Sequence, residues 1–239
     1  IYDRVQKISV TDKKEISLSK SQYDSVYDDL ALISNPFTVS ISNSLSPLEF
    51  LQLKDLPKNG FLKAKIYATN SDAVNVQENF DKLQLAAKSG RLTNIDVTTP
   101  LNLTSIQIKT SSDALKILSP STRLNVTGVK IAELSSTIKI PKLNTVSISD
   151  TSANINSSIG SIILAVKSGK ISTIETTDGK DIRVSKSQYD TLIAAGVIPE
   201  KLTVTGIPVS GIGFFTSADA IEIADTAANI YSNISTLIP

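Results

Sequence analysis

Apolar residues recur along this chain with two alternating periods, one typical of strands and the other of helices. The clearest stretch begins with Val146-Ser147-Ile148, where apolar and polar residues alternate as in a half-buried strand. Apolar residues then follow at spacings of three and four, which places them on one face of a helix. That face comprises Ile155, Ile159, Ile162, Ile163 and Val166. Two β-rich segments, a second helix and a last strand follow at 171–176, 182–184, 185–196 and 202–206. The pattern predicts a unit of strand, helix, hairpin, helix and strand.

Polar residues between these segments predict where the elements begin and end. Asp150 precedes the first helix and is expected to be its N-cap, because its carboxylate can accept hydrogen bonds from the free N–H groups of the first turn. Ser185 and Gln188 form an S-x-x-Q capping box for the second helix, and Ser19 begins the same phrase earlier in the chain. Asp178-Gly179 is typical of a two-residue hairpin turn, because both central residues of that turn need positive φ.

Several phrases of this unit return along the chain. Asp150-Thr151-Ser152-Ala153-Asn154-Ile155 returns 75 residues later as Asp225-Thr226-Ala227-Ala228-Asn229-Ile230, and Ser19-Lys20-Ser21-Gln22-Tyr23-Asp24 returns as Ser185-Lys186-Ser187-Gln188-Tyr189-Asp190. Self-similarity at a long period is typical of arrays in which each unit buries its apolar face against its neighbours. We therefore predict an α/β tandem repeat stacked into an elongated array. Its parts are the back half of a repeat plus an irregular segment at 1–62, repeat copies at 63–144 and 145–220, and a front half at 221–239.

The recurring polar residues are interpreted as structural. Asn75, Asn154 and Asn229 occupy the same helical position in three copies. One interpretation is a ladder of amides facing a ligand groove, and the favoured one is a buried Asn that hydrogen-bonds a neighbouring loop. Capping residues are expected to maintain the fold and to perform no chemistry; they are Ser19, Thr110, Ser185, Asp150 and Asp225.

The two partial copies at the ends of the chain complement each other. Joined, the tail and the head would form one complete repeat. Either this chain is cut from a longer array, or copies join head to tail through a heterologous contact that does not close. In the second case the assembly interface is expected to include apolar residues from both ends, namely Ile1, Tyr2, Val5, Ile230, Ile234 and Leu237.

Composition narrows the chemistry that the chain can perform. Of 239 residues 41% are hydrophobic and 20% charged, the net charge is +1, and Cys, His, Trp and Met are absent. Without Cys or His there is no thiolate nucleophile, no imidazole base and no ordinary transition-metal site. The small net charge does not indicate nucleic acid as a partner, and no apolar run is long enough to insert into a membrane. The missing Met predicts a processed or excised piece, and the abundance of Ser, Thr, Asn, Ile and Val without Cys suits an extracellular protein.

Because Cys and His are absent, calcium is the metal that we consider as a ligand of this chain. Asp12, Glu15, Asp178 and Asp181 sit at the expected hairpin tips, and Ca²⁺ takes six to eight oxygen ligands. Lysines adjoin both tips and oppose cation binding, whereas Asp and Gly are what such turns require for their conformation. We interpret these residues as solvated turn residues and expect no cofactor.

The recurring phrases resemble repeats of very large secreted bacterial surface proteins of the adhesin-like or surface-layer-like kind. The residues that carry the resemblance are Asp225 to Ile230, Ser185 to Tyr189 and Val204-Thr205-Gly206-Ile207. It covers most of the chain except about residues 44–62, and it implies a cell-surface or secreted location and a structural role without catalytic residues. The Gly-Gly-x-Gly-x-Asp calcium nonapeptide that often accompanies such proteins is absent, so calcium dependence is not carried over.

The sequence therefore predicts a structural building block of an extracellular adhesin, surface layer or filament, which contacts itself or adjacent repeats. The alternative is a carbohydrate- or receptor-binding module that uses the non-repeat segments 44–60 and 211–215. A carboxylate-based glycosidase would need two facing carboxyl groups about 5–10 Å apart, and the sequence nominates no such pair. We therefore expect no enzyme activity.

Overall fold

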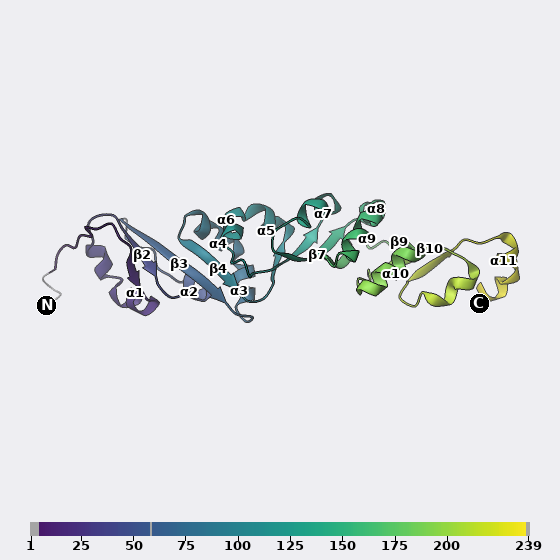
Figure 1. The fold of residues 1–239 in the computed structure, drawn as a ribbon, viewed down its shortest axis with the longest axis horizontal. Coiled ribbons are helices and arrows are strands. Elements are labelled where there is room, and N and C mark those ends of the chain that lie inside the picture. The colour runs from purple at the N-terminus through teal and green to yellow at the C-terminus, as the bar shows by residue number, and fades with distance from the viewer. Residues whose placement is uncertain (1–4, 58, 238–239) are drawn as a thin grey trace. The chain divides into compact units, whose positions relative to one another are not determined.

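The chain has a mixed α/β fold. The computed structural model describes residues 5–57 and 59–237, and these hold twelve α-helices, two 3₁₀ helices and strands in three parallel sheets. They form two compact units, residues 1–123 (unit 1) and 124–239 (unit 2). Figure 1 shows the order of the elements along the chain. The expected α/β class is thus observed.

Unit 1 contains a parallel sheet whose strands follow chain order, β1-β2-β3-β4. Each strand pairs with the next, for example Val39 with Leu62 and Ile66 with Ile95. Figure 1 shows β2, β3 and β4 side by side, with α4 next to β4 and α6. The elements of unit 1 are β1 (Ile16–Leu18), α1 (Lys20–Val26), η2 (Asp29–Leu32), β2 (Phe37–Ile41), α2 (Pro47–Leu51), β3 (Gly60–Ala68), α3 (Ala73–Glu78), α4 (Phe80–Lys88), β4 (Leu92–Val97), β5 (Leu101–Thr104), α5 (Ser105–Thr110) and α6 (Ser112–Lys116).

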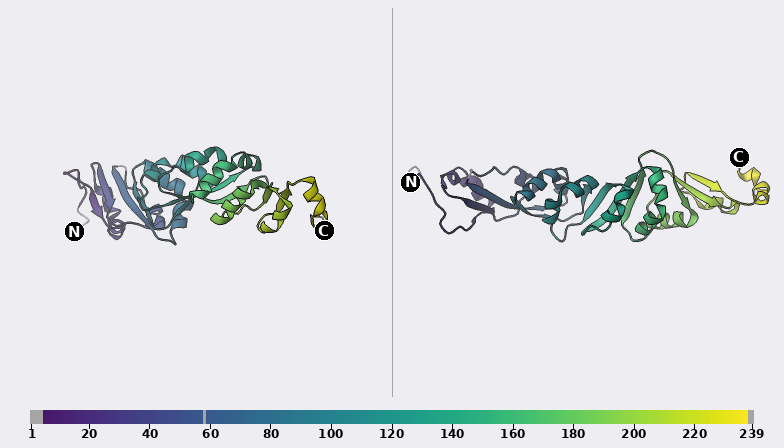
Figure 2. Two further views of the ribbon diagram at one scale, coloured as in Figure 1. Left: turned by 45° about the vertical axis from the view of Figure 1, so that its right-hand side comes forward. Right: turned by 90° about the horizontal axis from the view of Figure 1, so that it is seen from above.

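Unit 2 has the same style of pairing, with parallel neighbours β6-β7-β8 and β9-β10-β11. Figure 2 shows the unit from two further sides, and in both views its yellow C-terminal elements lie at its margin. The elements of unit 2 are β6 (Leu124–Val129), α7 (Ile131–Thr137), β7 (Leu143–Asp150), α8 (Ser152–Ser157), α9 (Ile159–Lys167), β8 (Ile171–Thr176), β9 (Ile182–Ser185), α10 (Lys186–Ala195), β10 (Leu202–Ile207), η3 (Val209–Phe214), β11 (Ala220–Ile223), α11 (Ala227–Ser232) and α12 (Ile234–Leu237).

The core of each unit lies between the sheet and the helices beside it. Alternate residues of β2 and β3 are buried, as the two-residue period of a strand requires. The helix face at Ile155, Ile162 and Val166 is also buried, with exposed fractions of 0%, 0% and 2%. The helical period thus located this face from the sequence, although the helix breaks at Ser158 into α8 and α9.

The predicted hairpins are wrong, because all paired strands are parallel. β8 pairs with β7 and β9 pairs with β10, so the two strands around Asp178-Gly179 belong to different sheets. Gly179 has the positive φ of 62° that the turn signal predicted, whereas Asp178 does not have the positive φ predicted for it. A turn signal specifies local backbone conformation, and it leaves the choice of strand partner to side-chain burial. Near the N-terminus, Ile8 forms an isolated parallel bridge with Ile33 instead of a hairpin strand.

The helix starts are set mainly by Ser and Thr. Ser19 and Ser185 are the N-caps of α1 and α10, and each forms the reciprocal capping box with Gln three residues later. The expected cap at Thr110 is wrong, because the capping box of that segment is formed by Thr104 and Gln107. Thr110 ends α5, and its hydroxyl donates to the carbonyl of Ile106 at 3.0 Å.

Candidate functional site

Asp150, the last residue of β7, accepts hydrogen bonds from three donors. Its Oδ2 accepts from the backbone N–H of Ile131 at 2.8 Å. Its Oδ1 accepts from the N–H of Thr151 at 2.8 Å and from the side-chain amide of Asn154 at 2.8 Å. Ile131 is the first residue of α7, whose N-cap Lys130 makes no side-chain cap. Asp150 therefore caps α7, a helix that precedes it in the chain.

Asp225 repeats this arrangement beside β11. It accepts from the N–H of Val209 at 3.0 Å, the N–H of Thr226 at 2.7 Å and the side-chain amide of Asn229 at 2.7 Å. The N-caps of α8 and α11 are Thr151 and Thr226, one residue later than the sequence predicts. The Thr hydroxyl serves the first turn of the following helix, which leaves the carboxylate available for the preceding one.

The expectation of buried Asn side chains is wrong for this motif. Asn154 and Asn229 are exposed, and each donates to the Asp four residues earlier rather than to a neighbouring loop. Asn75 is half-buried, and its backbone carbonyl accepts from the side chain of Asn79 at 3.0 Å. The amides of Asn154 and Asn229 thus lie at the helix surface, where each is used within its local turn.

Unit 1 uses different residues at the corresponding place. The helix between β2 and β3 begins with Pro47, and its N-cap Ser46 forms a capping box with Glu49. Proline has no backbone N–H, so the first residue of this helix needs no acceptor. Ala68, which is 0% exposed, ends β3 where Asp150 ends β7. An Asp carboxylate is thus present in unit 2, where the first helical residue has a backbone N–H to donate, and absent in unit 1, where that residue is Pro47.

Hydrogen bonding keeps these carboxylates ionised. Burial of Asp150 opposes ionisation, but hydrogen bonds from Ile131, Asn154 and Thr151 lower its pKa overall. The pKa of Asp225 is also lowered, first by the hydrogen bond from Asn229. These Asp residues are satisfied by protein donors, and we assign them a structural role.

The carboxylates of the predicted hairpin tips also face protein donors. Asp178 accepts from the backbone N–H of Ser152 at 3.1 Å and from its hydroxyl at 2.9 Å, and the backbone hydrogen bond is the main reason that its pKa is lowered. Asp181 accepts from the hydroxyl of Thr203 at 2.8 Å. Within residues 5–57 and 59–237, no three Asp or Glu side chains are placed to hold a metal ion.

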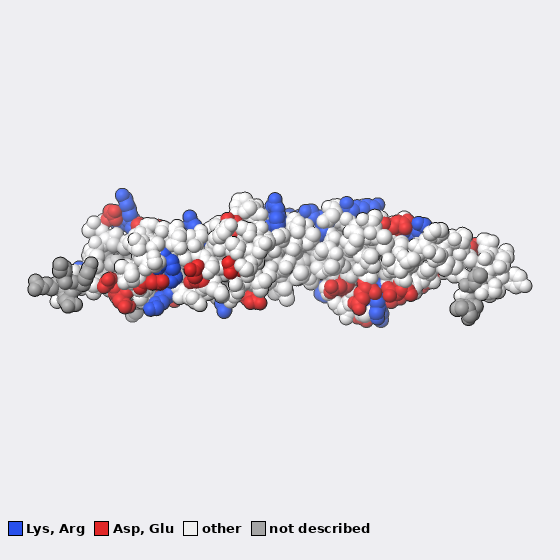
Figure 3. All heavy atoms as spheres, turned by 90° about the horizontal axis from the view of Figure 1, so that it is seen from below, with Lys and Arg blue, Asp and Glu red and all other residues white. Residues whose placement is uncertain are grey.

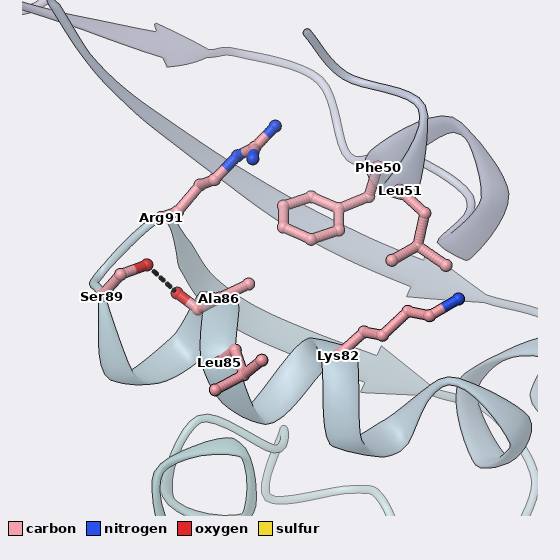
Figure 4. A pocket seen from close by; sticks show the side chains of 7 residues that line it. All are labelled: Phe50, Leu51, Lys82, Leu85, Ala86, Ser89 and Arg91. Carbon is pink, nitrogen blue, oxygen red and sulfur yellow. Dashed lines mark hydrogen bonds between the residues drawn. The ribbon is translucent and has the colours of Figure 1, made fainter. Parts of the chain in front are cut away.

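A pocket of about 260 Å³ lies in unit 1 beside the irregular segment 44–60 (Figure 4). Residues from this segment face residues of α4 and of the turn that follows it. The lining residues are Phe50, Leu51, Lys82, Leu85, Ala86, Ser89 and Arg91. Leu85, one of the apolar lining residues, is 68% exposed. Ser89 donates to the carbonyl of Ala86 at 3.0 Å, as the dashed line in Figure 4 shows.

Arg91 joins the pocket to the irregular segment. Its guanidinium donates to the carbonyl of Leu53 at 2.6 Å, pairs with Asp55 and lies 5.7 Å from the ring centre of Phe50. Its Nε is buried without a hydrogen-bond partner among the described residues. Tyr23 also holds the segment, donating to the carbonyl of Lys54 at 2.8 Å, and burial raises the pKa of Tyr23 to about 12. The segment is thus tied to its unit through its backbone.

The second non-repeat segment, 211–215, carries one buried and one exposed aromatic ring. Phe215 is 5% exposed and meets Tyr189 edge to face, with ring centres 5.1 Å apart. Phe214 is 74% exposed. A sugar-binding platform generally stacks several rings, and this segment offers a single accessible one.

The C-terminal elements of unit 2 carry an apolar face that the described residues leave uncovered. β11 and α11 contain no buried side chain, and Figure 3 shows a mostly uncharged surface at this end. Ile148 and Ile155 are both 0% exposed, whereas Ile223 and Ile230, their counterparts 75 residues later, are half-buried. We call the side chains of β11, α11 and α12 within residues 220–237 the terminal face, leaving aside Thr236.

Four of the six predicted assembly residues fall within the described part of the chain. Ile230 and Leu237 are half-buried and Ile234 is 48% exposed, and all three belong to the terminal face. Val5 is 43% exposed and lies in unit 1. Ile1 and Tyr2 lie outside the described residues. Tyr231, which is 81% exposed on α11, is an apolar surface residue that the sequence analysis missed.

On the face drawn in Figure 3, positive and negative side chains are scattered, and no large patch of one sign stands out. None of the helices within residues 5–57 and 59–237 combines the length and the apolar character that crossing a membrane requires. Comparison of the chain with protein-family models, with curated proteins and with solved structures found no match.

Proposed function

We propose that this chain is a structural building block of an extracellular surface assembly, built as a tandem array of α/β repeats. The order strand, helix, strand, helix, strand recurs three times along the chain and supports this proposal. The recurrences are β1-α1-β2-α2-β3, β5-α5/α6-β6-α7-β7 and β9-α10-β10-η3-β11. A helix broken at an equivalent residue follows each third strand; the breaks are at Asn79, Ser158 and Asn233.

The single observation that carries the proposal is the terminal face. Its residues have the apolar pattern of β7 and α8, whose apolar side chains are buried, yet no side chain of β11 or α11 is buried. An exposed contiguous apolar surface on a soluble domain generally marks an interaction site. A contact between this face and a different part of another copy is heterologous, and heterologous contacts that do not close generate filaments.

The assembly state of the chain tests the proposal. Light scattering over a range of concentrations, with negative-stain imaging, is expected to show growth into open-ended oligomers. Ile234→Lys places a charge on the terminal face and is expected to abolish growth. Leu164→Lys is the matched control, because Leu164 is an equally apolar helix residue with 69% exposure outside that face. A monomer at every concentration would refute the self-assembly.

The second candidate is a ligand-binding module, and the pocket beside Arg91 is the observation that favours it. The pocket combines an apolar rim with two cations, Lys82 and Arg91. A glycan carrying a carboxylate fits that chemistry through the ammonium group of Lys82, since the guanidinium of Arg91 already bonds Asp55 and the carbonyl of Leu53. Binding of acidic glycans on an array, lost in Lys82→Ala, would support this function. Absence of binding to any acidic glycan would exclude it.

A further inference from the structure

The N-terminal segment Val5-Gln6-Lys7-Ile8-Ser9-Val10 has the pattern of a fourth strand. It carries apolar residues at its first and fourth positions, as do β4 and β8. A residue with positive φ follows at the same distance after β8 and after this segment, with 62° at Gly179 and 58° at Lys13. The apolar pairs in β4 and β8 are at most 4% exposed, whereas Val5 and Ile8 are 43% and 38% exposed.

One edge of this segment is bonded as the edge of β4 is bonded. Ile8 forms an isolated parallel bridge with Ile33, and Ile95 of β4 forms one with Leu118. In both places the backbone N–H of the isoleucine donates to the carbonyl of the residue before its bridge partner. The backbone N–H of the residue after that partner donates to the carbonyl of the isoleucine, and all four distances are 2.7–3.0 Å. The other edge of β4 pairs with β3. Among the described residues, no strand pairs with the other edge of residues 5–10.

β11 also has one unpaired edge. It pairs with β10 on one side, and no strand of the described residues pairs with its other edge. The corresponding strands β3 and β7 are paired on both sides. The apolar positions of β11 are half-buried, as expected for a strand whose outer neighbour is missing.

We propose that residues 5–10 of one copy of this chain add to β11 of a second copy as its fourth parallel strand. This rests on the proposed function and specifies how the copies join. The register of β7 with β8 pairs Val146 with Ile171 and Ile148 with Ile174. β11 corresponds to β7, and residues 5–10 correspond to β8. The same register therefore places Val5 opposite Ile221 and Ile8 opposite Ile223. Backbone hydrogen bonds supply affinity in this mode of recognition, and side-chain pockets supply register.

The elements that flank the two edges complete the same interface. In unit 2, α8 contacts β9 and α9 contacts β8 and α10. Ile182 and Val184 of β9 are each 1% exposed, whereas their counterparts Ile16 and Leu18 of β1 are only half-buried. When residues 5–10 join β11, β1 and α1 of that copy meet α11 and α12 of the other. Both uncovered surfaces are then covered by one contact.

Charge agrees with this register. Ser147 of β7 pairs with Thr173 of β8. Glu222 of β11 corresponds to Ser147 and Lys7 corresponds to Thr173, so Glu222 and Lys7 would lie opposite each other. Lys7 is exposed, and Glu222 is exposed beside Arg183, with which it forms an ion pair. An acidic residue opposite a lysine favours this register over one slipped by a single residue, in which Lys7 would face Ile221 or Ile223.

Complementation between two single variants tests the proposal. Ile8→Lys damages only the N-terminal strand, and Ile223→Lys damages only β11. Each variant alone is expected to assemble at least about 30-fold more weakly than the unmodified chain, as loss of a central interface contact does. Mixed in equal amounts, they are expected to form a heterodimer, because each still has one intact partner surface. Leu164→Lys again serves as the control and should leave assembly unchanged.

Cysteine cross-linking tests the register, since the chain has no Cys of its own. Ile8→Cys mixed with Ile223→Cys is expected to give an intermolecular disulfide, because adjacent strands lie about 4.8 Å apart, within disulfide range. Ile8→Cys mixed with Glu222→Cys should not, since Glu222 faces the other side of the strand. Assembly that survives Ile8→Lys, without cross-links, overturns the strand addition and leaves the proposed function standing. Absence of assembly by the unmodified chain overturns both.

Discussion

Replacing Asp150 by Ala and Ile131 by Pro, singly and together, isolates the hydrogen bond that joins the end of β7 to the start of α7. Asp150→Ala leaves the N–H of Ile131 without its acceptor. Ile131→Pro removes that N–H at the first position of a helix, where Pro is well tolerated. The preceding residue, Lys130, has φ −78° and ψ 152°, the extended conformation that a residue before Pro prefers.

The magnitude follows from the three donors that Asp150 accepts. Hydrogen bonds to a charged group contribute about 1.5–3 kcal/mol each, but the donor from Asn154 lies on an exposed residue and will be replaced by water. Asp150→Ala is therefore expected to lower the free energy of unfolding by about 2–3 kcal/mol. In the double variant the orphaned donor is gone, so its loss should be smaller than the sum of the two single losses by about 1 kcal/mol.

Urea unfolding followed by far-UV circular dichroism measures these differences, and pH gives an independent readout. The pKa of Asp150 is lowered in the folded protein, so its stabilisation is fully present above the ordinary carboxyl pKa of about 3.9. It is lost as pH falls through the lower folded value. The difference between the unmodified chain and Asp150→Ala should therefore shrink in acid. Additive single losses, or a difference that stays constant down to about pH 2, would refute this account of the motif.

Three further outcomes are expected from urea unfolding. Arg91→Lys should cost about 1–2 kcal/mol, because an ammonium group cannot reach both Asp55 and the carbonyl of Leu53; an unchanged midpoint would contradict this. Gly196→Ala should cost about 1 kcal/mol, because Gly196 ends α10 at φ 68° with nothing within 4 Å of an added Cβ; a neutral result would show that the helix end relaxes. Ile148→Ala should cost about 3 kcal/mol and Ile223→Ala, measured at a concentration where the chain is monomeric, less than about 1 kcal/mol, since only Ile148 is fully buried; equal losses would mean that β11 is covered.

Local signals in the sequence were sufficient to locate most elements. The capping box at Ser185 and the end of its helix near Gly196 depend on atoms within a few residues of each other, so the local sequence was sufficient to predict them. The buried face at Ile155, Ile162 and Val166 follows from the helical period alone.

Long-range pairing was beyond those signals. Asp178-Gly179 fixes a turn, but the choice between a hairpin and two parallel sheets depends on which neighbours bury Ile174 and Ile182. The role of Asp150 could not be predicted either, because its partner Ile131 lies in the preceding helix. The pocket beside Arg91 could not be predicted, because the sequence of segment 44–60 does not resemble that of α7, which occupies the corresponding place between β6 and β7.

Within each sheet the strands occur in the order in which they are synthesised. Each strand from β2 to β4, and both β10 and β11, pairs with the strand one connection earlier in the chain. Contacts of this kind are local in sequence, which favours fast folding. A chain that emerges gradually from the ribosome is therefore expected to fold from its first strand onward without waiting for its last. At every stage one sheet edge is open to the next strand, so the folding of the chain uses the same parallel strand addition that we propose for the contact between copies.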